Sequence, residues 1–377
     1  MTVYVTLGEN AVADGCFPHR TEDYIVLKSL AEDYYLDMVY YYLGCLLYDR
    51  RAYGEAIADY EEAARRYPDF PTVHRNLALA YYNVKKQPQR AYEEMEKAFA
   101  LDETDARVYL ELDQLKKRLN VPVKERWSDM EKYFDLVESR DDLYLEYVTL
   151  LNTLGEPEKA LGLIKARKFH QWEGGEGKVA AQYLTALYQL AKAAVEKEDY
   201  AEAKELLLRA VGEYPHNLGE GKLESGQENN LYYLLGLVQE KLGEAKDAFE
   251  SLTRACCGES EPVGMMYYND QPPEMIYYQG LAYRMLGEEE QAVRRFQKLV
   301  DYGREHIRDD VKIDYFAVSL PDLLIFEENL NERNRKHCLF MMSLGLKGLG
   351  RIDEAEKCAE ELLAMDNAHQ EIRVHDL

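Results

Sequence analysis

The stretch HQWEGGEGK, residues 170–178, places one of the chain's two tryptophans among glycines and carboxylates. Its three glycines allow backbone conformations that other residues resist. The loop could therefore present Trp172 as a flat apolar platform flanked by Glu173 and Glu176, an arrangement that suits a sugar ring or a cationic group. A structural alternative stays open, in which Trp172 fills a gap between two packed elements.

Three later stretches carry side chains that could hydrogen-bond hydroxyls or pair with a carboxylate. Two are polar loops, NLGEGKLESGQENN and MMYYNDQPPE, and the rigid Pro-Pro of the second would preorganise its side chains. The third, NERNRKH, is the densest positive cluster, and its charges either pair with neighbouring carboxylates or receive a substrate carboxylate. The ligand candidates in these stretches are Lys222, Tyr267, Tyr268, Asn269, Asp270, Arg335 and His337.

Signals for ordinary catalytic chemistry are sparse. Two carboxylates facing one another across a groove could hydrolyse a glycosidic bond, and the weak candidates are Glu173, Glu176, Asp270 and Asp314. An acidic chain offers many such sets by chance. GxSxG, HExxH, EF-hand and strand-linked GxGxxG motifs are missing, and the six cysteines form no CxxC pair. We therefore expect no metal and no cofactor, and the sequence favours a non-enzymatic role for this chain alone.

A regular spacing of small residues predicts the helices between which these loops lie. Gly44 precedes Ala56 by twelve residues, and the same offset returns at Gly236 with Ala248 and at Gly280 with Ala292. Small residues at such places let two helices approach closely. Turns such as LGEP, KLGEA, LGEEE and LGRIDEA end one helix with Gly and begin the next with acidic residues. The pattern predicts an array of helical hairpins.

The stretch YYYLGCLLYDRRAYGEAIADYEEAARRYPDFP resembles the tetratricopeptide repeat, with its Leu-Gly pair followed by Ala, an aromatic residue, Ala and Pro. This resemblance covers nearly the whole chain. It implies an all-α fold, an α-α superhelix (a TPR-like solenoid). The repeats found along the chain predict about eight helical hairpins, and the wider spacing in the second half, 44–45 residues against 34, predicts long insertions between repeats there.

Several longer stretches, among them FHQWEGGEGK and KIDYFAVSLPDLLIFEENLNERNRKHC, resemble the C-terminal helical region of a group of large bacterial proteins of unknown function. The resemblance implies a cytoplasmic protein with a role in carbohydrate use. Those proteins carry an N-terminal β-sandwich like that of sugar mutarotases. The sandwich is absent from this sequence, so chemistry that belongs to it does not carry over.

The expected organisation is one continuous solenoid in three parts. Residues 1–36 form an N-terminal segment and first helix, 37–167 carry repeats with short linkers, and 168–377 carry repeats with long loop insertions. Residues 106–137 match poorly and predict a degenerate unit, and residues 3–7 are the one stretch that could compete as a strand. Four insertions between repeats, at residues 168–182, 215–230, 257–274 and 302–337, should project from one edge of the solenoid. In the last of them Phe316, Leu320, Leu323 and Phe326 are expected to pack inward.

The net charge of the chain limits the classes of partner that it can bind. With 46 Lys and Arg against 70 Asp and Glu, the net charge is −24, which disfavours nucleic acid and anionic membrane surfaces. No segment is apolar enough to span a membrane. The sequence favours a non-enzymatic scaffold that binds a protein, a peptide or a partner domain through its concave face or loop edge. The alternative is a helical part of a carbohydrate-active protein, whose loops form or complete a sugar site.

Overall fold

The computed structural model describes residues 18–34, 37–172, 174–222, 226–264, 270–312 and 325–375. Within these ranges the chain forms nineteen α-helices and one short 3-10 helix, with no strand. The predicted all-α fold is confirmed. The strand considered at residues 3–7 lies outside the described residues.

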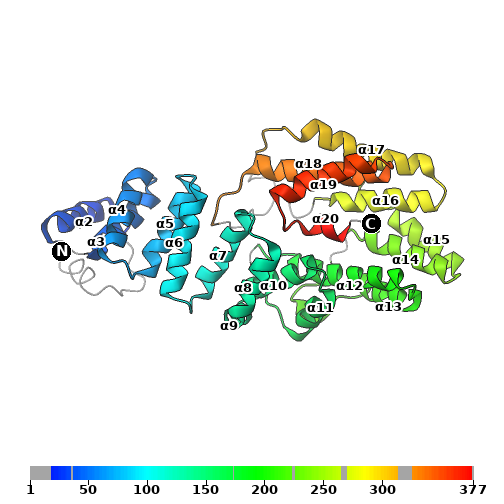
Figure 1. Ribbon diagram of the computed structural model, residues 1–377, viewed down its shortest axis with the longest axis horizontal. Coiled ribbons are helices and arrows are strands. Elements are labelled where there is room, and N and C mark those ends of the chain that lie inside the picture. Colours follow the sequence, from blue (N-terminus) through cyan, green and yellow to red (C-terminus); the bar gives the residue numbers. More distant parts are fainter. Residues whose placement is uncertain are drawn as a thin grey trace. The chain divides into compact units, whose positions relative to one another are not determined.

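The chain folds as two compact units. The first comprises residues up to Leu119 together with the short segment Leu324–Glu327, and the second comprises Asn120–Leu323 and Glu328–Leu377. The first unit contains α2 (Thr21–Tyr34), α3 (Asp37–Asp49), α4 (Tyr53–Arg66), α5 (Pro71–Asn83), α6 (Pro88–Leu101) and α7 (Ala106–Arg118) (Figure 1). In this unit α3 with α4 and α5 with α6 form antiparallel hairpins.

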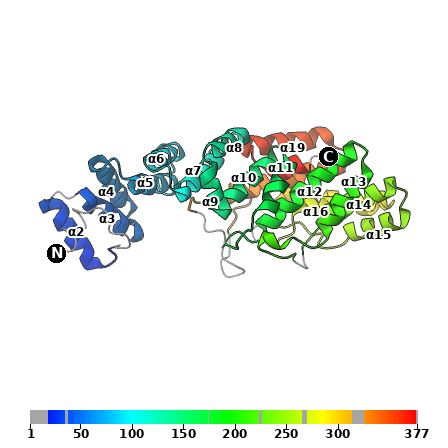
Figure 2. The ribbon, with the colours of Figure 1, turned by 90° about the horizontal axis from the view of Figure 1, so that it is seen from below.

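The second unit continues the same arrangement, and Figure 2 shows it from another side. Its hairpins are α10 with α11, α12 with α13, α14 with α15, α16 with α17 and α18 with α19. Residues 106–137, which match the repeat poorly, hold α7 and the short helices α8 and α9 in place of one regular hairpin. The helices of this unit are α8 (Val123–Lys132), α9 (Phe134–Ser139), α10 (Asp141–Thr153), α11 (Pro157–Ala166), α12 (Lys178–Glu196), α13 (Tyr200–Val211), η1 (His216–Leu218), α14 (Asn229–Lys241), α15 (Ala245–Ala255), α16 (Pro273–Met285), α17 (Glu289–His306), α18 (Leu330–Gly348), α19 (Ile352–Met365) and α20 (Gln370–Val374).

The small residues of the repeat lie where the two helices of a hairpin meet. A Cβ added to Gly44 would lie 2.5 Å from the ring of Tyr60 on the facing helix, and one added to Gly280 would lie 2.4 Å from the ring of Phe296. Both rings are buried. The close approach predicted from the twelve-residue offset is therefore confirmed, and the side chain that uses it stands four residues after the alanine.

The turns inside the hairpins also follow the sequence. The glycine of each LG turn has a left-handed backbone, with φ between 75° and 82°, at Gly155, Gly243, Gly287 and Gly350. Glycine adopts this conformation without the cost that a Cβ would bring. Acidic residues stand in the first turn of each following helix, where they complement the helix dipole.

Candidate functional site

The glycine-rich loop that drew attention in the sequence borders a pocket in the second unit. The pocket has a volume of about 300 Å³ and is lined by His170, Gln171, Trp172, Gly175, Glu176, Val179, Leu218 and Glu220. Val179 and Leu218 are buried and supply an apolar floor. The loop before α12 and the loop before α14 thus meet at one place, although more than forty residues of chain separate them.

The glycines of this loop have a steric purpose. A Cβ on Gly175 would lie 2.3 Å from the indole of Trp172, so the ring rests directly on the backbone of Gly175. Gly174 and Gly177 have φ of 80° and 73°, in the left-handed region that favours glycine. The indole itself is half-buried. The Gly-Gly-Glu-Gly sequence therefore turns the chain sharply beneath a tryptophan that still borders the pocket.

Glu220 joins the two loops by capping α12. One carboxylate oxygen accepts a hydrogen bond from the backbone N–H of Gly177 at 2.8 Å, and the other accepts from the N–H of Ala180 at 3.0 Å. A carboxylate at this place satisfies unpaired amides and meets the positive end of the helix dipole. Both carboxylate oxygens of Glu220 are therefore used in capping α12. Glu176 is the exposed carboxylate of the pocket.

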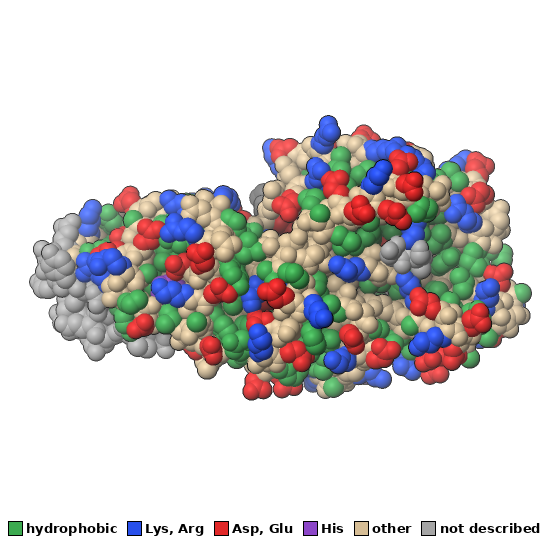
Figure 3. All heavy atoms as spheres, in the orientation of Figure 1, with side chains coloured by type: hydrophobic (Ala, Val, Ile, Leu, Met, Phe, Trp, Pro, Cys, Tyr) green, Lys and Arg blue, Asp and Glu red, His purple; other side chains and the backbone are tan. Residues whose placement is uncertain are grey.

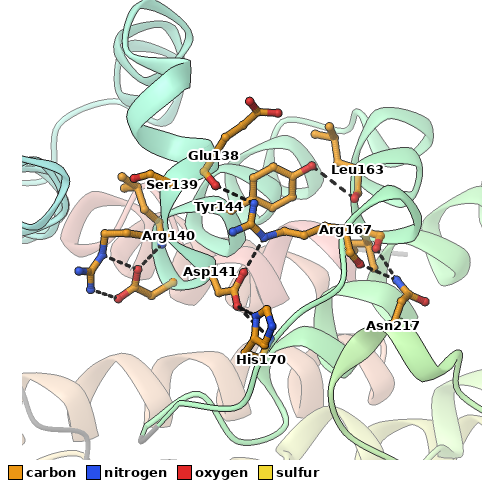
Figure 4. A network of polar contacts seen from close by, with 12 residues as sticks. Glu138, Ser139, Arg140, Asp141, Tyr144, Leu163, Arg167, His170 and Asn217 are labelled. Atoms are coloured by element: carbon orange, nitrogen blue, oxygen red, sulfur yellow. Dashed lines mark hydrogen bonds and ion pairs between the residues drawn. The ribbon is translucent and has the colours of Figure 1, made fainter. Parts of the chain in front are cut away.

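A polar network holds the start of the loop against α10 (Figure 4). Asp141 accepts hydrogen bonds from Arg167 Nε at 2.6 Å and from the backbone N–H of His170 at 2.9 Å. Arg167 also lies over the ring of Tyr144, with 4.4 Å between the guanidinium carbon and the ring centroid. Burial acts to raise the pKa of Asp141, but the hydrogen bonds from His170 and Arg167 outweigh it, and the pKa lies below its ordinary value. Asp141 is therefore an anchor that stays ionised.

A second feature of the same unit is α20, which packs on the first helices of the hairpins. The Gln370 side chain donates to Thr149 O on α10 at 3.1 Å, and Lys192 Nζ on α12 donates to Val374 O at 2.8 Å. At the end of α20 the buried His375 Nδ1 lies 3.1 Å from the hydroxyl of Tyr278 on α16. The helices α10, α12 and α16 thus hold a short polypeptide segment through one of its backbone carbonyls and through the side chains of Gln370 and His375.

Two titratable groups are buried at this contact. Burial, with a smaller contribution from the carboxylate of Glu371, raises the pKa of Glu274 to about 8. Burial, together with the positive charge of Lys192, lowers the pKa of His375 to about 3. Both side chains are therefore neutral near pH 7.

The first unit holds a comparable segment. The Asn83 amide at the end of α5 donates to Ile325 O at 2.8 Å, and its oxygen accepts from the N–H of Glu327 at 2.8 Å. Between these two residues Phe326 is 1% exposed and lies edge-on to the ring of Tyr82, with 5.1 Å between centroids. Each unit thus holds on its first helices a stretch of chain that belongs to no hairpin.

Comparisons with known families decide the fold's identity. A tetratricopeptide-repeat model matches residues 41–106 and 188–262, and a second one matches residues 274–302. These stretches contain α4 to α6 of the first unit and α13 to α15 of the second, with most of α3, α16 and α17. The fold is a tetratricopeptide-repeat α-solenoid.

Solved structures similar to this solenoid are distant in sequence. YrrB, described as a tetratricopeptide protein with an unusual peptide-binding site, is 19% identical, with a TM-score of 0.36 over 49% of this chain and 89% of its own. A tetratricopeptide protein from Parabacteroides merdae is 13% identical, with a TM-score of 0.36 over 74% of this chain and 92% of its own. A human IFIT1 dimer with PPP-AAAA is also 13% identical, with a TM-score of 0.35 over 91% and 77%.

The solenoid brings together only part of the predicted ligand set. Trp172 and Glu176 share the pocket, whereas Asp270, Arg335 and His337 do not line it. Arg335 on α18 pairs with Glu361 on α19. Glu173, Tyr267, Tyr268, Asn269 and Asp314 lie outside the described residues.

Two of the remaining candidates are held by neighbouring loops and helices. Lys222 Nζ donates to Val211 O at 2.8 Å and to Glu228 Oε2 at 2.7 Å. His337 is bound through Nε2 to Val263 O at 2.8 Å, and burial lowers its pKa to about 4. The neutral His337 thus joins α18 to the third insertion. Both side chains stabilise the structure at these positions.

Neighbouring insertions of the second unit are joined by side-chain amides. Asn217 Nδ2 in the second insertion donates to Ile164 O and Arg167 O, at the end of α11 and the start of the first insertion. Asn229 Nδ2, at the start of α14, donates to Cys257 O of the third insertion at 2.7 Å. These amides tie the second insertion to the end of α11 and to the third insertion.

The surface gives little sign of other chemistry. Figure 3 shows acidic and basic side chains interspersed over the face in view. In the described part of the chain no three His, Cys, Asp or Glu side chains are grouped so that they could hold a metal ion. Among the described helices none is long and apolar enough to cross a membrane.

Proposed function

We propose that this chain is a non-enzymatic scaffold that holds a segment of another protein, or a partner domain, on the face formed by the first helices of its hairpins. A β-sandwich of the kind that the sequence resemblance implies is one such partner domain. We assign the scaffold to the cytoplasm. The proposal concerns binding alone and assigns no reaction to the chain.

The observation that supports it most is the docking of α20. Its backbone carbonyl at Val374 accepts from Lys192 Nζ on α12. Its Gln370 amide donates to Thr149 O on α10 and accepts from Gln182 Nε2 on α12, so the first helices already hold a polypeptide segment. Lys192 bonds a backbone group, which any segment offers, whereas Gln370 and His375 are bound through their side chains. The rings of Tyr188 and Tyr278 each lie 5.5 Å from the His375 ring at the end of α20, and tyrosine adds such contact area with little entropy to lose.

A selection experiment tests this proposal on the full chain. A random displayed peptide library would be selected on the immobilised protein, and the enriched peptides measured against Asn83→Ala on α5 and Lys192→Ala on α12. Lys97→Ala on α6 and Lys246→Ala on α15, which are exposed on second helices, serve as matched controls. We expect at least a tenfold loss of affinity in a first-helix variant and less than twofold in the controls. Enrichment of no peptide, or equal losses in both groups, would contradict the proposal.

The Trp172 pocket supports a second candidate, a site for a sugar. Its volume of about 300 Å³ is at the small end of ligand sites, and it combines an indole wall, an apolar floor and polar side chains at its rim. Tryptophan emission of a Trp127→Phe variant, in which Trp172 alone reports, would be titrated with mono- and oligosaccharides. A saturable change that Glu176→Gln abolishes and Glu158→Gln preserves is expected for this site. A flat titration across the panel would remove the sugar candidate.

A further inference from the structure

The segment Ile325–Glu327 makes its contacts far from its neighbours in the chain. It stands between α17 and α18 of the second unit in sequence, yet it belongs to the first unit in space (Figure 1). Asn83 bonds the carbonyl before Phe326 and the N–H after it, each at 2.8 Å. One side-chain amide thus satisfies two backbone groups of the segment, without reference to the side chains at positions 325 and 327.

Three further contacts hold the segment, and two of them involve its side chains. The Phe326 ring is buried edge-on against Tyr82, and its carbonyl accepts from Arg118 Nη2 at 3.0 Å. The Glu327 carboxylate accepts from Lys86 Nζ at 2.6 Å. The protein therefore recognises an aromatic residue followed by an acidic one, with donors at the ends of α5 and α7.

The attachment is small enough to be exchanged. Only Phe326 is deeply buried, and the Lys86 and Glu327 side chains are 65% and 64% exposed, where an ion pair is weak. One hydrogen bond donated by Asn83, one that it accepts, one from Arg118 and one aromatic contact form far less than the interface of a stable complex. A segment held this way competes with any other of the same chemistry.

We propose that the C-terminal ends of α5 and α7 form a recognition site for a partner segment with an aromatic residue followed by an acidic residue. Ile325–Glu327 is the resident ligand of this site, and the partner segment replaces it. This inference rests on the proposed function and names the site and the ligand class. It fails separately from that function, because a peptide that binds the first helices without Asn83 would overturn only this assignment.

The test uses the labelled peptide DLLIFEEN, which copies residues 322–329, and fluorescence polarisation. The Phe326→Ala chain has a vacated ring pocket and is expected to bind the peptide at least tenfold more tightly than the wild type. Adding Asn83→Ala should reverse the gain at least tenfold, whereas adding Lys97→Ala should leave it unchanged. Equal binding by wild type and Phe326→Ala, or no effect of Asn83→Ala, would overturn the site.

A charge exchange tests the acidic position. In the Phe326→Ala background, Lys86→Glu should weaken binding of DLLIFEEN at least threefold and strengthen binding of DLLIFKEN by a similar factor. If Lys86→Glu changes the affinity for both peptides in the same direction and by the same factor, the preference for an acidic residue is overturned.

A measurement on the wild type covers the case in which Phe326→Ala does not fold. Excess peptide should speed hydrogen exchange at the Glu327 amide, because displacement removes its bond to Asn83. The peptide DLLIAEEN, in which alanine replaces the phenylalanine, should leave the exchange of this amide unchanged. Unchanged exchange would overturn the replacement. A wild-type dimer that Phe326→Ala dissociates would also overturn the proposal, since the occupant would then be a second copy.

Discussion

Replacing the buried Glu274 by glutamine should stabilise the second unit at neutral pH. Glu274 lies in the first turn of α16 and is 7% exposed, with the carboxylate of Glu371 on α20 nearby. Burial raises its pKa from 4.5 to about 8. Between these two values the folded chain keeps the proton and the unfolded chain releases it. The free energy of unfolding therefore falls as pH rises through this window.

The size of the effect follows from the pKa shift. Each pH unit above 4.5 costs the folded state about 1.4 kcal/mol until the folded pKa is reached. At pH 7 the cost is roughly 3 kcal/mol, and glutamine removes it because it carries no titrating proton. Glu274→Gln should consequently match the wild type near pH 4.5 and exceed its stability by up to about 3 kcal/mol at pH 7.

Urea unfolding followed by circular dichroism at pH 4.5, 6 and 7.5 measures this difference. Glu158→Gln on α11, where the side chain is exposed, is the control and should show no pH-dependent gain. A difference between Glu274→Gln and wild type that is the same at all three pH values would refute the reasoning. A Glu274→Gln chain that is less stable than the wild type at pH 7.5 would refute it as well.

Two further substitutions test individual contacts. Tyr278→Phe removes the hydroxyl that lies 2.6 Å from Tyr188 Oη and 3.1 Å from His375 Nδ1. Leaving these buried groups without a partner should lower the free energy of unfolding by about 1–3 kcal/mol, and an unchanged urea midpoint would contradict the contact. Gly175→Ala places a Cβ within 2.3 Å of the indole of Trp172, so in a Trp127→Phe background the ring should move and its emission shift to longer wavelength. An unaltered spectrum would show that the ring does not rest on Gly175.

The hairpins could be predicted from the sequence because their packing repeats. Gly44 and Gly280 stand at the same distance before an alanine, and each receives an aromatic ring from the facing helix. Because each hairpin needs small residues at the same places, these residues recur in the sequence at a regular spacing. The division of the chain into two units left no such pattern, and the boundary expected at residue 168 stays a prediction.

The candidate site was predictable only in part. Trp172 and Glu176 stand together in one unusual stretch, and both line the pocket. Glu220 completes it from another loop, which is held in place by amide contacts of Asn217 that leave no mark in composition or spacing. The contact between Asn83 and Ile325 joins residues 242 positions apart. A bond between one side chain and a distant backbone has no signal in a single sequence.

The central claim, that first-helix faces of the solenoid hold a partner segment, is tested most directly by hydrogen exchange. A library-selected peptide would be added to the full chain, and the exchange of every helix compared with and without it. The account predicts slower exchange on α5 and α7, or on α10, α12 and α16, with second helices such as α6 and α15 unchanged. Protection confined to second helices, or to the loop around Trp172, would contradict it.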